Sequence, residues 1–454
     1  MENSELDDTI VAIATPPGYG AIAVIRLDGK CAFNTLRKIA PDLKDIVPRQ
    51  AQLLSLVDRE TLLDQALVTC FKGPQSYTGN DLVEIGCHGS PYVVDRLIDL
   101  CLTFGARLAH PGEFTKRAFL NGKMNLTQAE AVAEIVFANH QAAHQSSINL
   151  LKGVTGQAFQ QIREQLINLI SILELELDFS DQENEPQKPQ KTKQSVKSIL
   201  NEINTLISTY SYGKIVREGA HVPIVGPPNS GKSSLLNALI MEDRAIVTPF
   251  PGTTRDLIEG SYHKEGYLFR LFDTAGLRTT SNPVEKIGIE RAYQMVQKAD
   301  MVLYVLDLSE PIRDGIIESF AYKHPTLIVL NKADIAKSKN IEAYLQLAGN
   351  LPKVVISAKR NQGLDELSKF MVQQIKLRAP ASQHQVLTLK RHCDALRRAA
   401  KHLRAANRQL TLNQPAEIII TELRWALEHI DQILGKTYNE EILHNIFDHF
   451  CIGK

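Results

Sequence analysis

The chain has 454 residues, of which 44% are hydrophobic and 22% charged, so it carries enough apolar side chains for several buried cores. Lys plus Arg and Asp plus Glu both total 51, and this zero net charge excludes a polybasic surface as the general means of binding nucleic acid. The acidic start, the lack of an apolar run long enough to span a membrane, and six scattered cysteines predict a cytoplasmic protein of about three domains, without a disulfide framework or a Cys-ligated zinc site.

The first part of the chain has the pattern of an α/β domain. Two short apolar runs, 9–14 and 21–27, are separated by Pro16, Pro17, Gly18 and Gly20, which predicts strand, turn, strand. Further strands are expected at 65–71 and 81–86, followed by a helix over 91–103. We therefore expect a domain over residues 1–120.

The rest of the chain predicts a helical domain that is interrupted by a second α/β module. Ala and Leu recur at helical spacing from 124 to 177 and helical patterns return from 195 to 211 and after 385, while 180–194 has the composition of an exposed linker. Between them, apolar runs alternate with helical patterns, which is typical of a mostly parallel sheet. The runs are 222–225, 268–272, 301–308, 327–330 and 354–356. The expected domains are thus 121–218 and 378–454 (helical, in two parts) and 219–377 (the inserted module).

A phosphate-binding loop is predicted at the start of the inserted module. The segment Gly226-Pro-Pro-Asn-Ser-Gly-Lys-Ser233 fits Gly-x4-Gly-Lys-Ser and lies between an apolar run and a helical pattern. In that context, backbone N–H groups and the helix N-terminus surround phosphates. Lys232 is expected to reach the β- and γ-phosphates and the Ser233 hydroxyl to hold Mg²⁺.

Three later motifs indicate that the base is guanine. They are Asp273-Thr-Ala-Gly276, Asn331-Lys-Ala-Asp334 and Ser357-Ala-Lys359, and each follows an expected strand. A carboxylate that accepts from N1–H and the 2-amino group of guanine would lack a partner with adenine, and such a site can discriminate ~10⁴–10⁵-fold. The predicted GTP-binding residues are Asn229, Ser230, Gly231, Lys232, Ser233, Ser234, Thr248, Thr253, Thr254, Asp273, Thr274, Ala275, Gly276, Asn331, Lys332, Ala333, Asp334, Ser357, Ala358 and Lys359.

The residue after Asp-Thr-Ala-Gly is Leu277, where many GTPases place a glutamine that orients the attacking water. Leucine cannot do this, so the enzyme needs another device. A positive charge is also needed at the transition state, and Arg255, Arg278 or a monovalent cation could supply it. The threonine pair Thr253-Thr254 is placed to complete the metal and γ-phosphate shell.

Two further patterns, a glycine-rich segment and a row of basic residues, give no firm prediction of a binding site. Gly18-Tyr-Gly-Ala-Ile-Ala23 fits a dinucleotide fingerprint, but a strand pattern follows it where a helix is required, so we reject it. Arg397, Lys401, Arg404 and Arg408 recur at helical spacing and are expected on one helix face. That face is either simply solvated or contacts the backbone of an RNA arm.

Taken together, the motifs resemble the tRNA modification GTPase MnmE (TrmE) family. The similar segments are the phosphate loop, Gly252-Thr-Thr-Arg-Asp, Asp273-Thr-Ala-Gly-Leu-Arg, Ile287-Gly-Ile-Glu-Arg-Ala, Ala14-Thr-Pro-Pro-Gly, Thr78-Gly-Asn-Asp-Leu-Val-Glu84, His110-Pro-Gly-Glu-Phe-Thr-Lys-Arg-Ala-Phe-Leu-Asn-Gly-Lys123 and the terminal Cys451-Ile-Gly-Lys454. They cover essentially the whole chain. The resemblance implies an N-terminal folate-binding α/β domain, a discontinuous helical domain and an inserted Ras-like GTPase domain.

For GTP hydrolysis, the resemblance implies a K⁺ ion in the place of an arginine finger. Its ligands would be Asn229, Thr248, the Phe250 carbonyl and Thr253, while Ser233 and Thr254 would hold Mg²⁺. Glu285 resembles the glutamate that orients the attacking water, although its position alone would suggest a solvated acid at a helix start. Asn229, judged alone, could equally be an amide that stabilises its loop.

For the other domains, the resemblance implies a tetrahydrofolate derivative (5-formyl or 5,10-methylene) at Arg26, Glu84, Lys123 and Lys454, and a homodimer formed through the first domain. Cys451 would act in tRNA modification as nucleophile or as acid/base, although a terminal cysteine is commonly an inert thiol. With a flavin-containing MnmG (GidA) partner, the chain would add an aminomethyl or carboxymethylaminomethyl group to C5 of the wobble uridine in tRNA. The alternative is a regulatory GTPase of ribosome or RNA assembly, which modifies nothing.

Overall fold

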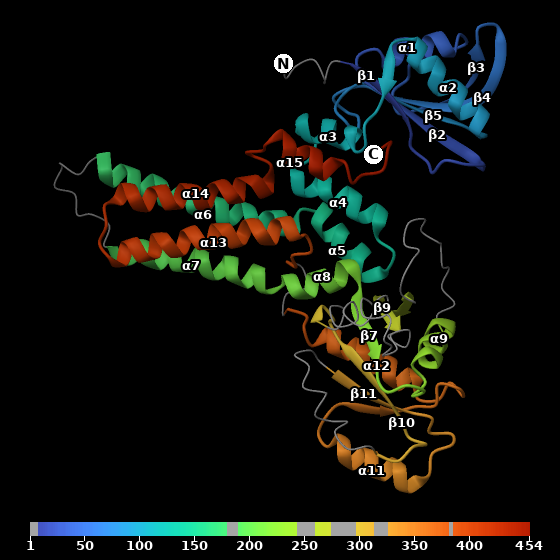
Figure 1. Cartoon of the computed structure of the whole chain (residues 1–454). Coiled ribbons are helices and arrows are strands. Elements are labelled where there is room, and N and C mark those ends of the chain that lie inside the picture. The colour runs from blue at the N-terminus through green and yellow to red at the C-terminus, as the bar shows by residue number, and fades with distance from the viewer. Residues whose placement is uncertain (1–7, 179–188, 243–258, 274–296, 313–325, 381–384) are drawn as a thin grey trace, which may run out of the picture. The chain divides into compact units, whose positions relative to one another are not determined.

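The computed structural model describes residues 8–178, 189–242, 259–273, 297–312, 326–380 and 385–454 (Figure 1). The chain divides into two compact units. The first consists of Met1–Phe137, Ser147–Leu200 and Ala395–Lys454, and the second of Ala138–Ser146 and Asn201–Asp394. No helix in the described part of the chain is long and apolar enough to cross a membrane.

The N-terminal part of the first unit is a sheet with helices on one face. Its strands are β1 (Thr9–Ile13), β2 (Gly20–Asp28), β3 (Ala51–Asp58), β4 (Thr61–Phe71), β5 (Leu82–Gly89) and β6 (Ala106–Leu108), in the spatial order β3-β4-β5-β2-β1-β6. Only the β1–β6 pair is parallel. The helices α1 (Ala32–Ile39) and α2 (Pro91–Thr103) bury Leu36 and Leu97 against Ile25 and Ile85 of the sheet, which forms one continuous core.

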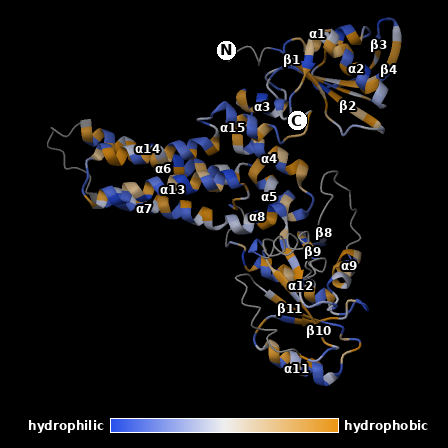
Figure 2. Cartoon of the chain, in the orientation of Figure 1, coloured by the Kyte–Doolittle hydropathy of each residue, from blue (hydrophilic) through white to orange (hydrophobic). Residues whose placement is uncertain are grey.

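The remainder of the first unit is helical. Its helices are α3 (Glu113–Leu120), α4 (Leu126–Phe137), α5 (Gln141–Leu151), α6 (Val154–Asp178), α7 (Pro189–Ser208), α13 (Lys390–Thr411), α14 (Ala416–Leu434) and α15 (Glu440–Phe447), with α5, α7 and α13 continuing into the second unit. Figure 2 shows hydrophobic and hydrophilic residues interleaved along α6, α13 and α14, as expected for helices that bury one face each. An ion pair between Arg163 and Asp431 (Nε to Oδ1, 2.5 Å) joins α6 to α14.

The second unit contains the inserted α/β module. Its strands are β7 (Ala220–Val225), β8 (Glu259–Lys264), β9 (Tyr267–Asp273), β10 (Val302–Asp307), β11 (Thr326–Asn331) and β12 (Lys353–Val355), in the order β12-β11-β10-β7-β9-β8. All neighbours are parallel except β8 and β9. Its helices are α8 (Tyr210–Glu218), α9 (Lys232–Glu242), α11 (Ser338–Ala348) and α12 (Leu364–Lys376). The carboxyl ends of five strands therefore meet along one edge.

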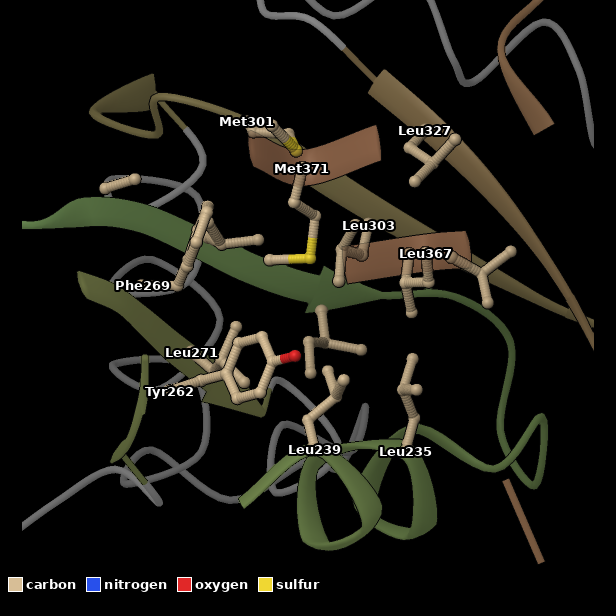
Figure 3. Close-up of a cluster of buried hydrophobic side chains, with 14 of the residues drawn as sticks. Leu235, Leu239, Tyr262, Phe269, Leu271, Met301, Leu303, Leu327, Leu367 and Met371 are labelled. Carbon is tan, nitrogen blue, oxygen red and sulfur yellow. The ribbon is translucent and has the colours of Figure 1, made fainter. Parts of the chain in front are cut away.

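The larger core cluster of this module packs α8, α9 and α12 against the sheet, and a second cluster packs α11 against it. Leu235 and Leu239 of α9 and Met371 of α12 point toward Phe269 and Leu303 of the sheet (Figure 3). Strand β10 is buried at all six positions, which explains why its sequence shows a continuous apolar run and not an alternating one. This packing fixes the strand ends and hence the loops that follow them.

The expected fold class is confirmed in its α/β, helical and inserted GTPase-like parts, and the strand at Gly20–Asp28 confirms the rejection of the dinucleotide fingerprint. One expectation is wrong. The composition of residues 189–194 predicts part of a linker, but they form the first turns of α7. Proline is well suited to the first helical position, and Lys and Gln are good helix formers even without apolar neighbours. The expected linker residues 180–188 lie outside the described residues, and the bounds of the four expected segments stay predictions.

Candidate functional site

The phosphate loop connects β7 to α9, as the sequence predicted. Helix α9 begins at Lys232, so the free N–H groups of its first turn face the loop. The Lys232 ammonium turns back and donates to the carbonyl oxygens of Gly226 (3.0 Å) and Pro227 (2.8 Å). Burial lowers the pKa of Lys232, although Asp273 opposes this shift. A phosphate group would relieve that burial cost, because it offers the cation an opposite charge.

Asn331 ties the phosphate loop to the two base-recognition motifs. Its side chain is almost fully buried, and its Nδ2 donates to the Ser230 carbonyl at 2.9 Å. Its Oδ1 accepts from the backbone N–H of Lys332 (2.8 Å) and of Ala358 (3.1 Å). Asn331 was expected to contact the guanine edge. In this structure both ends of its amide are bound within the protein, so it holds three loops together.

Gly231 makes this junction possible. Its φ is +92°, which favours glycine, and an added Cβ would lie only 2.3 Å from Nδ2 of Asn331. The phosphate loop can therefore approach the strand end of β11 only because residue 231 has no side chain. The neighbouring Ser230 hydroxyl is buried and has no hydrogen-bond partner among the described residues.

Oxygen ligands suited to Mg²⁺ meet next to the loop. The Ser233 Oγ donates to Asp273 Oδ2 at 2.5 Å, which brings a hydroxyl from the start of α9 beside a carboxylate from the end of β9. Hydroxyl and carboxylate oxygens are the ligands that Mg²⁺ prefers. Among the described residues, no group of three or more His, Cys, Asp or Glu side chains could hold a metal ion. Metal binding here would thus need hydroxyl, water and phosphate oxygens as well.

The carboxylate that the sequence predicts as the acceptor for guanine, Asp334, is held by the last motif. Ser357 Oγ donates to Asp334 Oδ1 at 2.7 Å, and Arg360 lies 3.8 Å from its other oxygen. The hydrogen bond from Ser357 is the main cause that lowers the pKa of Asp334. Asp334 is therefore ionised at neutral pH and can accept from the N–H groups of a guanine edge. Ala333 precedes Asp334 in the chain, and Lys359 lies two residues after Ser357, in the loop of the last motif.

Of the other predicted residues of this site, two lie at the phosphate loop and the rest lie outside the described residues. Asn229 lies on the exposed part of the phosphate loop with φ +61°, next to Ser230. Ser234 follows in the first turn of α9 and is exposed. The remaining predicted GTP, K⁺ and water-orienting residues lie outside the described residues. They are Thr248, Phe250, Thr253, Thr254, Thr274, Ala275, Gly276 and Glu285.

A second cluster of polar groups lies on the N-terminal sheet. Arg26 of β2 and Glu84 of β5 face each other in register, and their ion pair has an Nη2 to Oε1 distance of 2.6 Å. The guanidinium lies over the rings of Tyr77 and Phe114, 5.5 and 5.6 Å from their centroids. An arginine, a carboxylate and two aromatic rings can together recognise a flat heterocycle that carries amide and amino groups. Tyr77 and Phe114 were missed by sequence reasoning.

The C-terminal tail is bound at this cluster. Arg26 Nη1 donates to the carbonyl oxygen of Gly453 at 3.1 Å, across 427 positions of the chain. Gly453 has φ +92°, and an added Cβ would lie 2.2 Å from the carbonyl oxygen of Ile13 in β1. On the other side Phe450 is buried among apolar residues of α3, α4 and α15. Cys451, like its neighbour Ile452, is thus exposed in a segment that is held on both sides.

The two predicted lysines reach this region by different routes. Lys454 belongs to the bound tail, and its backbone N–H donates to the carbonyl oxygen of Cys451 at 3.2 Å. The ammonium of Lys123 donates to the carbonyl oxygen of Pro74 at 2.8 Å, in the loop that also carries Tyr77. The structure therefore brings Arg26, Glu84 and the tail together and connects Lys123 to the loop beside them.

In comparisons with known proteins, two family models together match nearly the whole chain. The family model "GTP-binding protein TrmE N-terminus" matches residues 9–123, and the model "MnmE helical domain" matches residues 126–451. A protein of Cytophaga hutchinsonii called "tRNA modification GTPase MnmE" is 38% identical, over 98% of this chain and 98% of its own length. A protein of Chlorobium chlorochromatii with the same name is 40% identical, over 99% and 98%. A crystal structure of a variant of Aquifex aeolicus Era bound to GDP·AlF4⁻ is 28% identical over 40% of this chain and 66% of that one, with a TM-score of 0.29.

Proposed function

Because the chain belongs to the family of the tRNA modification GTPase MnmE, we propose that it binds and hydrolyses GTP and that this reaction serves the modification of tRNA. The observation that supports this most strongly is the junction at Asn331. It connects the phosphate loop to both base-recognition loops, as a guanine nucleotide site requires. An intact junction argues against a protein that has merely kept the shape of such a site.

In this proposal, two residues of the phosphate loop and α9 exchange their present hydrogen bonds for contacts with the nucleotide and its metal ion. Lys232 leaves the loop carbonyls of Gly226 and Pro227 and binds the β- and γ-phosphates. Ser233, whose hydroxyl now donates to Asp273, would be one protein ligand of Mg²⁺, and Thr254 would be the second. When bound, Mg²⁺ neutralises charge on the phosphate oxygens. Asp334 selects guanine over adenine.

We further propose that K⁺ supplies the positive charge that an arginine finger gives to other GTPases, with Asn229, Thr248, Phe250 and Thr253 as its ligands. The exposed position of Asn229 at the phosphate loop supports this role, since an ion can reach its side chain there. Glu285 would orient the attacking water in place of a glutamine. The experiment is GTP hydrolysis in KCl and in NaCl. We expect several-fold or greater stimulation by K⁺ and its loss in Asn229→Ala, whereas equal rates in the two salts would refute the K⁺ assignment.

At the N-terminal sheet, we propose a site for a tetrahydrofolate derivative, 5-formyl or 5,10-methylene, with Arg26, Glu84, Lys123 and Lys454 as contacts. Glu84 would accept from the amino edge of the pterin, and the cations would bind the glutamate tail. The rings of Tyr77 and Phe114 support the proposal, because they flank Arg26 where a flat ring would need a partner. The folate would supply the one-carbon unit of the tRNA reaction.

Cys451 is proposed to act in that reaction, as nucleophile or as acid/base. Its support is the docking of Phe450 and Gly453 on either side, which holds an exposed thiol close to Arg26. A Cys451→Ser variant is expected to hydrolyse GTP normally and to lose tRNA modification. If the variant modifies tRNA at the rate of the unaltered chain, the tail has no chemical role.

The partners proposed are a second copy of this chain, a flavin-containing MnmG (GidA) protein and tRNA, whose wobble uridine would receive the new group at C5. Exposed apolar side chains on the N-terminal sheet support the dimer. Leu53 and Leu67 stand opposite each other in β3 and β4, and both are exposed, as is Ile22 of β2. Exposed apolar side chains clustered on a sheet face mark an interaction surface. A cytoplasmic location stays a prediction.

Folate binding separates this function from the alternative. A regulatory GTPase of ribosome or RNA assembly has no use for a one-carbon donor or for Cys451. Titration of the full chain with 5-formyltetrahydrofolate is therefore expected to show saturable binding with one site per chain. Full GTP hydrolysis without any folate binding would favour the regulatory GTPase.

A further inference from the structure

Strand β10 ends in an aspartate that none of the motifs includes. Asp307 follows five buried apolar residues, and its own side chain is only 10% exposed. Its Oδ2 accepts from the ammonium of Lys332 at 2.5 Å. Its Oδ1 accepts from the backbone N–H of Ser309 at 2.9 Å and from the Ser309 hydroxyl at 2.6 Å. A carboxylate with both oxygens used in this way has a fixed orientation.

The partner of this carboxylate is the second residue of the base-recognition motif. Lys332 has φ +64°, a backbone conformation that residues with side chains rarely adopt. Its backbone N–H is held by Asn331 Oδ1 and its ammonium by Asp307, so the residue is fixed at both ends. Such a conformation persists only when the surroundings determine it. Asp307 is one of the groups that do so, beside Asn331 and the backbone N–H of Ile335, which donates to the Lys332 carbonyl oxygen at 3.2 Å.

The pairing of β10 with β11 places Asp307 close enough to hold the side chain of Lys332. Asp307 and Asn331 are opposite each other in the parallel register of β10 and β11, and the N–H of Leu308 donates to the carbonyl oxygen of Asn331 at 2.9 Å. Burial would raise the pKa of Asp307, but the hydrogen bonds from Lys332 and Ser309 outweigh it and the pKa is lowered. The side chain is thus a carboxylate at neutral pH, as an ion pair with Lys332 requires.

We propose that Asp307 is a positioning residue of the guanine site, which holds Lys332 so that Asn331 and Asp334 keep the geometry needed to bind the base. The inference rests on the proposed binding of GTP. Asp307 touches the protein and not the nucleotide, so its effect passes through Lys332. Without it, the Lys332 side chain loses its fixed position and the left-handed turn between Asn331 and Asp334 loses one of its supports.

The expected kinetic signature is specific. The base is bound in the same way before and during cleavage of the γ-phosphate, so a weaker base site raises KM and leaves kcat nearly unchanged. Loss of a hydrogen bond to a charged group corresponds to about a tenfold or larger change in affinity. General damage to the domain would instead lower kcat as well.

The experiment uses the full chain and a fluorescent GDP analogue. Asp307→Asn is expected to weaken GDP binding about tenfold or more and to raise KM for GTP by a similar factor. The matched control is Asp365→Asn, which removes the same charge from ion pairs with Lys264 (2.8 Å) and Lys369 (2.7 Å) on the same domain. The control is expected to bind GDP as the unaltered chain does.

Two further variants keep the test decisive if Asp307→Asn does not fold. Ser309→Ala removes one hydrogen bond from Asp307 and is expected to weaken GDP binding about threefold. Asp307→Glu keeps the charge and is expected to recover part of the affinity. If the unaltered chain binds GDP while Asp307→Asn and Ser309→Ala bind it equally well, the inference is wrong. If the unaltered chain binds no guanine nucleotide, it is the proposed function that fails.

Discussion

The two sheets of this protein build their sites in opposite ways. In the second unit, five parallel strands end along one edge, and each candidate GTP residue that the structure describes lies at the end of a strand, in the loop that follows, or at the start of the next helix. In the first unit, the sheet is almost wholly antiparallel, and Arg26 and Glu84 project from the middle of paired strands. Their further partners come from a loop, from the start of α3 and from the C-terminal tail.

The difference explains what each site depends on. The GTP site is held by contacts between loops at neighbouring strand ends, which lie up to 101 positions apart in the chain. The N-terminal cluster requires the last residues of the chain to return to the second strand, over a separation of 427 positions. Closing so long a loop has an entropic cost that only the docked contacts offset. Changes in one site should therefore leave the other intact, and the following variants test that independence.

The largest effect is expected at Gly231. Gly231→Ala places a Cβ within 2.3 Å of the Asn331 amide and separates the phosphate loop from β11, so GDP affinity should fall by about 100-fold or more. Gly349→Ala is the control, because its φ is also positive but nothing lies within 4 Å of the added Cβ. Equal GDP binding by the two variants would show that the contact with Asn331 does not shape the site.

Arg26 should give the next largest effect, on the other site. Arg26→Gln removes the charge that binds Glu84 and Gly453, so binding of 5-formyltetrahydrofolate is expected to weaken about tenfold or more. GTP hydrolysis should not change. Arg96→Gln, which breaks an ion pair with Asp58 in the same unit, is the control and should bind folate normally. Isothermal titration measures both variants, and undiminished binding by Arg26→Gln would remove this residue from the site.

A smaller effect is expected from loosening the tail without touching Cys451. Gly453→Ala places a Cβ 2.2 Å from the Ile13 carbonyl oxygen, so the tail should bind in a shifted position and tRNA modification should slow several-fold. GTP hydrolysis in the same preparation should be normal. Gly105→Ala, where the φ is also positive and the space is open, serves as the control. Normal modification by Gly453→Ala would mean that Cys451 works without a docked tail.

The smallest effect is expected on tRNA binding, from α13, which contributes to neither of the two sites on the sheets. Arg397, Lys401, Arg404 and Arg408 lie on one face of this helix, as the spacing predicted, while Leu396, Leu403 and Leu410 are buried. If the face contacts RNA phosphates, Arg404→Gln combined with Arg408→Gln should weaken tRNA binding a few-fold and lower the slope of log affinity against log salt by about 0.7–0.9 per lost contact. Arg424→Gln on α14 is the control. An unchanged slope would indicate a face that is only solvated.

The same comparison shows what the sequence could predict. The GTP motifs were found because each is a short run after an apolar strand, and the strand pattern itself is local. The N-terminal residues were identified only through the family resemblance, since nothing in the sequence places Arg26 beside Gly453 or between Tyr77 and Phe114. Asp307 was missed because one aspartate after an apolar run resembles any strand end. The signal, in retrospect, is a carboxylate that ends a fully buried strand beside the Asn-Lys-x-Asp strand.

The sequence also could not predict that the amide of Asn331 forms its hydrogen bonds within the protein. Motif spacing places an amide at the end of β11, but it cannot tell whether that amide points to the base or into the protein. Its burial and three hydrogen bonds depend on loops that lie far from it in the chain, around Ser230 and Ala358. The choice between the two roles is made by packing, which the three-dimensional structure alone specifies.

The most direct test of the account is the wobble uridine itself. Cells that lack this chain should be supplied with the unaltered chain, Lys232→Ala or Cys451→Ser, and the nucleosides of their tRNA measured by mass spectrometry. The account predicts that a C5-modified wobble uridine disappears without the chain and returns only with the unaltered one. The same level of modified uridine in cells with and without the chain would contradict it.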